Sequence, residues 1–230
     1  MIVAVIPARG GSKRIKKKNL KNFLNKPIIY YPIKQIQKSK LFDKTIVSTD
    51  NKEISKISKK FGAEILFERP KKLSNDYATT QEVITHSVKW LTKNNYKPDI
   101  ICCIYPTSVF INSHNLKESY KLFTKKKWDF IFSATNYLYP IQRAFYQKKN
   151  GSIKMFRPKN YFKRSQDFKK SYHDAGQFYW GTYDAWLNTK NLFNGNSTTY
   201  LLSQLKAHDI NNIEDWKIAE KLYLINNKKI

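Results

Sequence analysis

A chain of 230 residues, 41% hydrophobic and 15% aromatic, can bury one sizeable core, so we expect a folded domain and not a disordered chain. The sequence has no run of about 18 apolar residues, so no membrane-spanning helix is expected. Its short apolar start soon meets Arg9 and does not resemble a signal peptide. We therefore expect a cytoplasmic protein.

The formal net charge of +26 raises the hypothesis of a nucleic-acid-binding protein. The 43 basic residues are spread along the whole chain, however, and only six of them are Arg. Proteins that read nucleic acids usually concentrate Arg and aromatic residues on one surface or in a recognisable module, and no such module is visible. We expect no nucleic-acid partner and keep this function as the alternative from a different class.

The first predicted element is a buried strand over MIVAV, followed by the loop IPARGGSKRIKKKN, residues 6–19. Gly10 and Gly11 allow a tight turn that brings backbone amides close to an anion. The loop matches neither the Walker A nor the dinucleotide-binding motif. Its donors and cations predict a phosphate site, and they are Arg9, Ser12, Lys13, Arg14 and Lys18.

Strands and helices then alternate. Apolar side chains at helical spacing predict four helices. The first begins near Pro27, and the second follows a cap at Asn51 and ends before Gly62. The third lies around Ile84 and the fourth over 113–125. Short apolar runs predict strands at 44–50, 63–67, 99–105 and 129–135.

These units predict an α/β, Rossmann-like fold: a mostly parallel sheet with helices on both faces. Ligands of such sheets bind beyond the carboxyl ends of strands, where Arg9–Asn19, Ser48–Asp50 and Tyr105–Ser108 would meet. Cys102 and Cys103 are neighbours on one strand and point to opposite faces, so we expect buried free thiols and no disulfide.

The helical period is lost from about residue 137. We interpret 137–170 as an excursion from the sheet, a dimerisation or substrate-lid subdomain within a single domain covering 1–230. The remaining predicted elements are a strand at 173–181, a short helix at 183–189, a strand at 205–210 and a last helix capped by Asn212.

The loop string resembles the signature of the acylneuraminate cytidylyltransferases, which make CMP-linked nonulosonic acids. The likeness continues through the chain in VSTD (47–50), ERPKKLSND (68–76), PTS (106–108), RSQD (164–167) and D-I-x-x-x-E-D-W (209–216). The segments CCIYPTSVF, PIQRAF and YHDAGQFYWG are similar to the branch whose acceptor is pseudaminic acid. The resemblance covers residues 1–226 and implies a nucleotide-diphospho-sugar transferase fold and a homodimer.

The implied reaction transfers CMP from CTP to the anomeric hydroxyl of a nonulosonic acid and releases pyrophosphate. This in-line displacement needs positioning and charge neutralisation, with Mg²⁺ as cofactor, more than covalent catalysis. Arg9 and Lys18 take the catalytic roles. The resemblance assigns the nucleotide to Arg9, Gly10, Gly11, Ser12, Lys18 and Asn19, and the cytosine to Arg69, Ala78 and Thr80.

The family holds its metal with a D-x-D pattern, which this chain replaces by Asp209 and Asn211. Asn supplies a neutral oxygen, so Asp209 would act with triphosphate oxygens. One alternative is therefore a CTP-binding regulator that has lost catalysis.

On the sugar side the resemblance assigns Tyr105, Gln177 and Tyr179 to the acceptor. Arg143 and Arg164 are candidates for binding the sugar carboxylate from a neighbouring subunit, or are exposed surface arginines. His173 with Asp174 is either a general-base pair or a turn. Acceptors that remain open are pseudaminic, N-acetylneuraminic and legionaminic acid.

Overall fold

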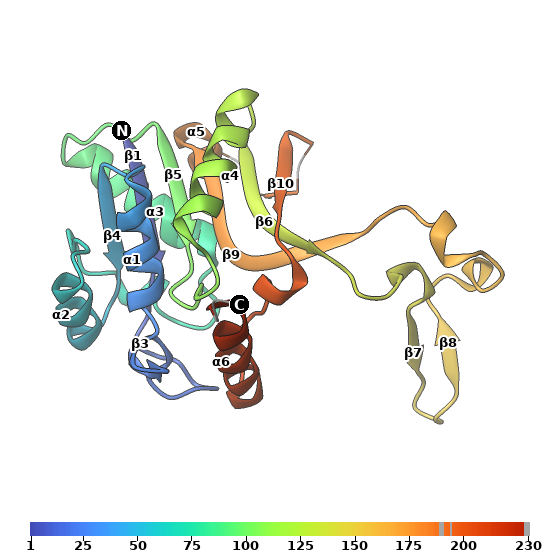
Figure 1. Ribbon diagram of the computed structural model, residues 1–230. Coiled ribbons are helices and arrows are strands. Elements are labelled where there is room, and N and C mark those ends of the chain that lie inside the picture. The colour runs from blue at the N-terminus through green and yellow to red at the C-terminus, as the bar shows by residue number, and fades with distance from the viewer. Residues whose placement is uncertain (189–190, 194, 228–230) are drawn as a thin grey trace.

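A six-stranded sheet forms the centre of the molecule, in the order β10-β6-β9-β5-β1-β4 (Figure 1). The computed structural model describes residues 1–188, 191–193 and 195–227. Pairs β1·β4, β1·β5 and β6·β10 are parallel, and β9 alone runs antiparallel to both of its neighbours. The predicted mostly parallel sheet is thus confirmed. Its strands are β1 (Ile2–Pro7), β4 (Lys44–Ser48), β5 (Ile100–Ile104), β6 (Phe130–Asn136), β9 (Tyr172–Thr182) and β10 (Ser197–Leu201).

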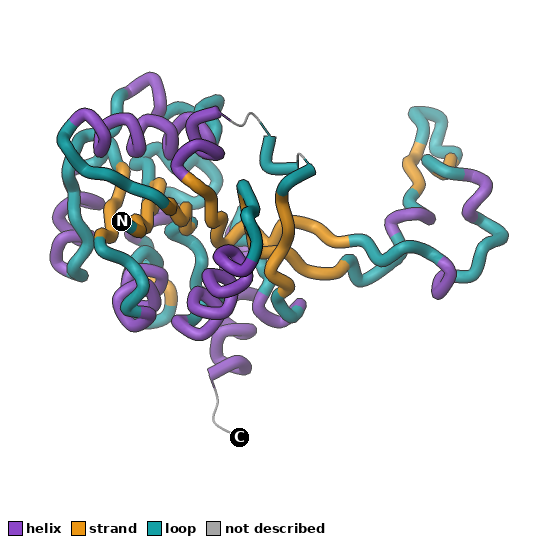
Figure 2. The backbone as a smooth tube through the Cα atoms, turned by 90° about the horizontal axis from the view of Figure 1, so that it is seen from above, coloured by secondary structure: helices purple, strands orange, loops and turns teal. Residues whose placement is uncertain are grey.

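Helices cover both faces of this sheet, as Figure 2 shows. Ala4 and Ile6 of β1 share a buried cluster with Ile33, whereas Val3 and Val5 on the other face share one with the α3 side chains. The alternation follows from the period of two along a strand. The helices are α1 (Tyr30–Ser39), α2 (Lys52–Lys60), α3 (Thr80–Lys93), α4 (Ser113–Lys125), α5 (Tyr183–Asn188) and α6 (Ile213–Asn227).

Local capping fixes where several helices begin and end. The Asn51 side chain accepts from the amides of Glu53 and Ile54, and Gly62 has φ 88° just beyond α2, as predicted. Asn212 likewise caps α6 by accepting from Asp215 N over 3.0 Å. Cys102 and Cys103 are buried, unpaired and on opposite faces, as expected.

Three expectations are wrong in detail. Residues 63–67 form no strand: the segment makes one isolated parallel bridge, between Glu64 and Ile46 of β4, and a second bridge joins Glu68 to Thr49 just beyond them. Pro27 lies in the short strand β3 (Lys26–Pro27), which pairs with β2 (Asn22–Phe23), and α1 starts three residues later.

The predicted strand at 205–210 is also wrong. The last strand is β10, whose Ser-Thr-Thr-Tyr run pairs with β6. Residues 204–206 form a 3-10 helix, and the chain then crosses the carboxyl end of the sheet. Other 3-10 helices lie at Lys18–Leu20, Lys71–Leu73, Ile141–Arg143, Pro158–Asn160 and Ser165–Asp167.

An arm leaves the sheet between β6 and β9 and extends well away from the main body (Figures 1 and 2). We call residues 137–171 the arm. It carries the antiparallel pair β7 (Phe145–Gln147) and β8 (Ile153–Met155), turned at Gly151 with φ 82°. Its large apolar side chains are exposed: Tyr139 by 81% and Phe162 by 89%. The arm therefore has no core of its own within the described chain. None of the described helices is long and apolar enough to cross a membrane.

Candidate active site

The loop of residues 8–19 follows β1 at the carboxyl end of the sheet. Ala8 donates its amide to the Ser48 carbonyl over 2.9 Å, and Gly10 donates to Oδ1 of Asp50 over 2.8 Å. Asn19 is buried and donates from Nδ2 to the Arg9 carbonyl over 2.9 Å. Hydrogen bonds to the Ser48 carbonyl and to Asp50, together with the one from the Asn19 side chain, thus hold the loop at one edge of the sheet.

Gly10 and Gly11 differ in what surrounds them. A Cβ on Gly10 would lie 2.9 Å from Cβ of Asn51, closer than real Cβ atoms approach, so Gly10 packs the loop against the cap of α2. Its amide is already bonded to Asp50. A Cβ on Gly11 would meet no described atom within 4 Å. Gly11 is therefore the glycine that leaves room for a ligand.

Cationic and polar side chains of the loop face the 209–211 segment across a pocket of about 260 Å³. Segments far apart in sequence meet there, because β1 and β5 are parallel neighbours and the chain crosses above them after β10. The pocket is lined by Pro7, Arg9, Ser12, Lys13, Arg14, Ile15, Lys18, Asn19, Tyr105, Pro106, Thr107, Asp209 and Asn211.

Asp76 pairs with two cations of this pocket. Its Oδ1 lies 2.7 Å from Nη2 of Arg9 and its Oδ2 lies 2.5 Å from Nζ of Lys13. Hydrogen bonds from Lys13 and then Arg9 lower the pKa of this carboxyl group, which keeps it charged. A carboxylate thus lies where sequence reasoning expects phosphate, and the charge pattern of the loop gave no signal for this pairing.

Lys18 is a half-buried cation of the pocket. It donates from Nζ to the Ile210 carbonyl over 2.8 Å, which joins the loop to the 209–211 segment. Burial lowers the pKa of Lys18, the nearby Asp209 carboxylate opposes that shift, and Arg14 and Arg9 reinforce it. Lys18 is thus a partly desolvated positive charge, which acts strongly on an anion at close range.

Asp209 and Asn211 lie side by side at this pocket, with Asn211 Nδ2 donating to Asp209 Oδ2 over 2.6 Å. A carboxylate and an amide oxygen are the hard ligands that Mg²⁺ accepts, and Mg²⁺ commonly completes its shell with substrate phosphate and water. Among the described residues, no group of three or more His, Cys, Asp or Glu side chains could hold a metal. The donor set fits Mg²⁺ that shares its shell with a triphosphate.

Arg69 and Ala78 line none of the pockets described here. Arg69 is buried, donating from Nε to Ser48 Oγ over 3.2 Å and from Nη2 to the Ser48 carbonyl, and burial lowers its pKa to about 10. The Ala78 amide donates to Oδ1 of Asn75 over 2.9 Å. Arg69 thus anchors the end of β4, and cytosine contacts at these residues stay a prediction.

A second pocket of about 300 Å³ adjoins the first and shares Tyr105 with it. Tyr105 Oη and Thr80 Oγ1 are 2.7 Å apart and hydrogen-bonded, and burial raises the pKa of Tyr105 to about 12. Tyr179 donates from Oη to Asp174 Oδ2 over 2.6 Å. The lining residues are Thr79, Thr80, Gln81, Tyr105, Asp174, Tyr179, Trp186, Asn191, Leu192 and Phe193.

His173 and the Asp174 carboxylate do not form the hydrogen-bonded pair that a general base would need. His173 donates from Nδ1 to the backbone carbonyl of Asp174 over 2.9 Å, and its ring packs against Tyr137. Asp174 instead bonds Tyr179, which lies five residues along β9 on a strand bent at Gly176, where φ is 62°. Sequence reasoning also missed Leu192 and Phe193, which line this pocket, because nothing in their own segment indicates that it lies beside β9.

Three predicted acceptor residues lie outside both pockets. Gln177 is buried, and its Nε2 donates to the Lys206 carbonyl. Arg143 and Arg164 lie on the arm, where Arg143 donates to the Lys163 carbonyl and stacks on Phe168. Their approach to an acceptor would need the arm of another subunit.

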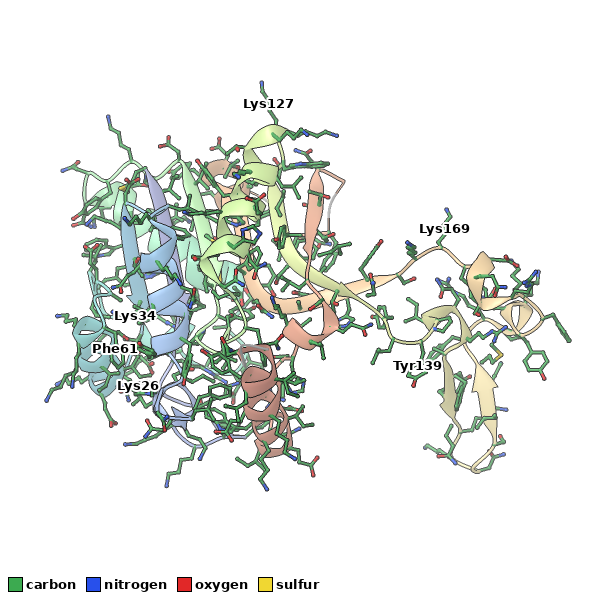
Figure 3. The ribbon with its side chains drawn as sticks, in the orientation of Figure 1. Lys26, Lys34, Phe61, Lys127, Tyr139 and Lys169 are labelled. Carbon is green, nitrogen blue, oxygen red and sulfur yellow. The ribbon has the colours of Figure 1, made fainter. Side chains whose placement is uncertain are left out.

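Basic side chains lie on several parts of the molecule. Figure 3 labels Lys127 at the end of α4, Lys34 and Lys26 on the opposite part of the main body, and Lys169 on the arm. Lysines placed this far apart do not by themselves form the single basic surface that is typical of nucleic-acid recognition.

The chain is similar to known cytidylyltransferases over nearly its whole length. The cytidylyltransferase family profile matches residues 3–230. A pseudaminic acid cytidylyltransferase of Campylobacter jejuni is 42% identical over 98% of this chain and 97% of its own. A Helicobacter pylori protein named as pseudaminic acid cytidylyltransferase and UDP-2,4-diacetamido-2,4,6-trideoxy-β-L-altropyranose hydrolase is 35% identical over 95% of this chain and 42% of its own.

Two solved structures share the fold. A CMP-2-keto-3-deoxy-manno-octonic acid synthetase complexed with CTP superposes with a TM-score of 0.71 at 15% identity, over 98% of this chain and 99% of its own. A 4-diphosphocytidyl-2C-methyl-D-erythritol synthase from Anaerococcus prevotii superposes with a TM-score of 0.62 at 12% identity, over 96% of each chain.

Proposed function

Because the chain belongs to the cytidylyltransferase family, whose members are nucleotidyltransferase enzymes, we propose that it transfers CMP from CTP to a nonulosonic acid. The acceptor atom is the anomeric hydroxyl, and the acceptor that we propose is pseudaminic acid. Pyrophosphate is the second product. The observation that carries the proposal is the meeting of Arg9, Lys18 and Asp209 in one pocket that adjoins a second one across Tyr105.

Support for pseudaminic acid comes from the relatives' names and from the second pocket. The full-length Campylobacter jejuni relative carries that acid in its name. The hydrolase activity in the Helicobacter pylori name concerns a sugar with two acetamido groups and few hydroxyls. The second pocket combines hydroxyl groups with the apolar side chains of Leu192 and Phe193, which suits such an acceptor.

The reaction asks this chain mainly to position two anions and to balance charge. Arg9, Ser12 and Lys13 would hold the triphosphate in the first pocket. Lys18 would stabilise the negative charge that grows on the departing pyrophosphate. Bound at Asp209 and Asn211, Mg²⁺ would neutralise phosphate charge. CTP is a cytoplasmic metabolite, so we place the reaction there.

The arm supports a homodimer. An isolated two-stranded hairpin is marginally stable in water, and the arm exposes Leu138 by 74% and Phe162 by 89%. Packing against a second copy would cover these side chains. It would also bring Arg143 and Arg164 near another subunit's acceptor pocket, as the resemblance implies.

An acceptor panel tests the proposal. We expect pyrophosphate release only when CTP, Mg²⁺ and a nonulosonic acid are all present, with the highest kcat/KM for pseudaminic acid. Equal or better turnover of N-acetylneuraminic or legionaminic acid would reassign the acceptor. Binding of CTP without turnover of any acid would favour a regulator. Steeply salt-dependent duplex binding without CTP binding would favour the nucleic-acid alternative, which the comparisons do not support.

A further inference from the structure

Asp174 is the one ionisable carboxylate that lines the second pocket within the described chain. It extends from β9 next to the bend at Gly176, on a residue that is itself exposed. Leu192 and the exposed Phe193 contribute apolar surface to the same pocket. A lone carboxylate in a partly apolar pocket is costly unless protein or ligand donors satisfy it, so its partners decide what it can do.

Two protein donors fix the Asp174 carboxylate in place. Oδ2 accepts from Tyr179 Oη over 2.6 Å, and Oδ1 accepts from the Gly176 amide over 2.7 Å. Tyr179 is itself buried, with 3% exposure, so its hydroxyl is held rigidly by the sheet. An ionised carboxylate offers about four acceptor positions. Burial raises the pKa of the Asp174 carboxyl group, and the hydrogen bonds from Tyr179 and Gly176 oppose that shift. Acceptor capacity therefore remains when the group is ionised.

The other polar groups of the pocket complement this acceptor. The hydrogen-bonded hydroxyls of Thr80 and Tyr105 stand at the border with the first pocket. An acylamino group carries one N–H donor, one carbonyl acceptor and one methyl group. A carboxylate, a hydroxyl and an apolar wall are the partners that these three parts require.

We propose that Asp174 is a specificity-determining residue, which accepts a hydrogen bond from the N–H of an acylamino group on the acceptor sugar. Tyr179 is its positioning residue. This inference rests on the proposed function, since it concerns the acceptor of that reaction. It goes further in assigning one contact and one chemical group to a residue that the family resemblance left unassigned.

The test compares three acceptors and three variants. The acceptors are a nonulosonic acid that carries two acylamino groups, here called the diacylamino acid, and its two isosteres in which an ester oxygen replaces one N–H at a time, because an ester keeps the carbonyl and the methyl group. The variants are Asp174→Ala, Tyr179→Phe and, as a control, Asp184→Ala. Asp184 is an exposed carboxylate on α5 that lines none of the described pockets. Calorimetric CTP binding reports whether each variant is folded.

We expect Asp174→Ala to raise KM for the diacylamino acid by about tenfold or more, which is typical for a hydrogen bond to a charged group. For one ester isostere, whose wild-type KM is already raised, the same variant should add less than about twofold. Tyr179→Phe should raise KM in the same direction but less. CTP affinity should stay within about twofold in every variant, and Asp184→Ala should match the wild type.

Equal effects of Asp174→Ala on the diacylamino acid and both isosteres would overturn the inference, and so would an unchanged KM. Loss of CTP binding in both Asp174→Ala and Tyr179→Phe would assign Asp174 to folding and would also overturn it. If the wild type is active and Asp174→Ala behaves like Asp184→Ala, only this inference fails. If the wild type turns over no nonulosonic acid, the proposed function fails with it.

Discussion

Asp76 Oδ1 lies 2.7 Å from Nη2 of Arg9, so a carboxylate of the 68–76 segment forms an ion pair with a cation of the candidate phosphate site. The same carboxylate pairs with Lys13 through its other oxygen. A triphosphate that binds Arg9 and Lys13 must displace or share these partners. The segment between α2 and α3 is thereby coupled to the loop after β1.

Replacing Asp76 with Asn should strengthen CTP binding by about two- to fivefold, because an exposed competing charge is removed. Isothermal calorimetry at fixed ionic strength measures the change. The matched control is Glu53→Gln, which removes the exposed carboxylate that pairs with Lys17 over 2.9 Å on the outer side of the same loop. Weaker CTP binding in Asp76→Asn alone would show that Asp76 supports the nucleotide and does not compete with it.

Lys18→Ala should lower kcat by about 10²- to 10³-fold, as removal of a transition-state donor typically does. The KM for CTP should change much less, because Arg9 and Ser12 remain in the pocket. Steady-state pyrophosphate release measures both constants. Lys16→Ala is the control, since Lys16 is exposed on the same loop. Near-normal turnover in Lys18→Ala would remove Lys18 from the mechanism.

The pH dependence should also report Lys18. Burial lowers the pKa of Lys18, so its ammonium group loses its charge at a lower pH than an ordinary lysine does. The kcat/KM profile of the free enzyme should therefore fall on the alkaline side below the usual lysine range. Lys18→Arg should move that fall to higher pH, whatever its effect on the maximum, since guanidinium stays charged. If the alkaline fall in kcat/KM occurs at the same pH in Lys18→Arg as in the wild type, that fall reports the titration of another group.

Asn211→Asp should increase Mg²⁺ affinity in the presence of a CTP analogue. The change places a second carboxylate beside Asp209, whose Oδ2 already lies 2.6 Å from the Asn211 side chain. A tighter site by about tenfold would match the added charge. Calorimetric Mg²⁺ titration measures this without turnover. Asn212→Asp, one residue further along, is the control, and an equal gain there would indicate a general charge effect.

Phe162→Asp should dissociate the proposed dimer. Phe162 is 89% exposed on the arm, so its replacement costs the isolated chain little packing. Sedimentation velocity should show a monomer with an unchanged melting temperature of the main body. Lys127→Glu, at the end of α4 far from the arm in Figure 3, controls for the charge change. A wild-type protein that is monomeric at micromolar concentration would contradict the dimer.

The sequence alone determined the elements that local physics controls. Helix α4 spans 113–125 as predicted, and Asn51 and Asn212 cap the helices that follow them, because a cap and an apolar period are properties of neighbouring residues. The loop after the first buried strand was also predicted from its glycines and cations, and its binding of phosphate stays a prediction. The resemblance supplied the reaction.

Tertiary structure decided what depends on distant partners. The direction of β9, the use of β10 in place of 205–210, and the broken pairing of 63–67 depend on which strands become neighbours. The pairing of Asp76 with Arg9, and of Asp174 with Tyr179, depends on where loops and a bend at Gly176 place side chains. Hydrophobic period and capping carry no information about such distances, because both act within one element, whereas a site is assembled between elements.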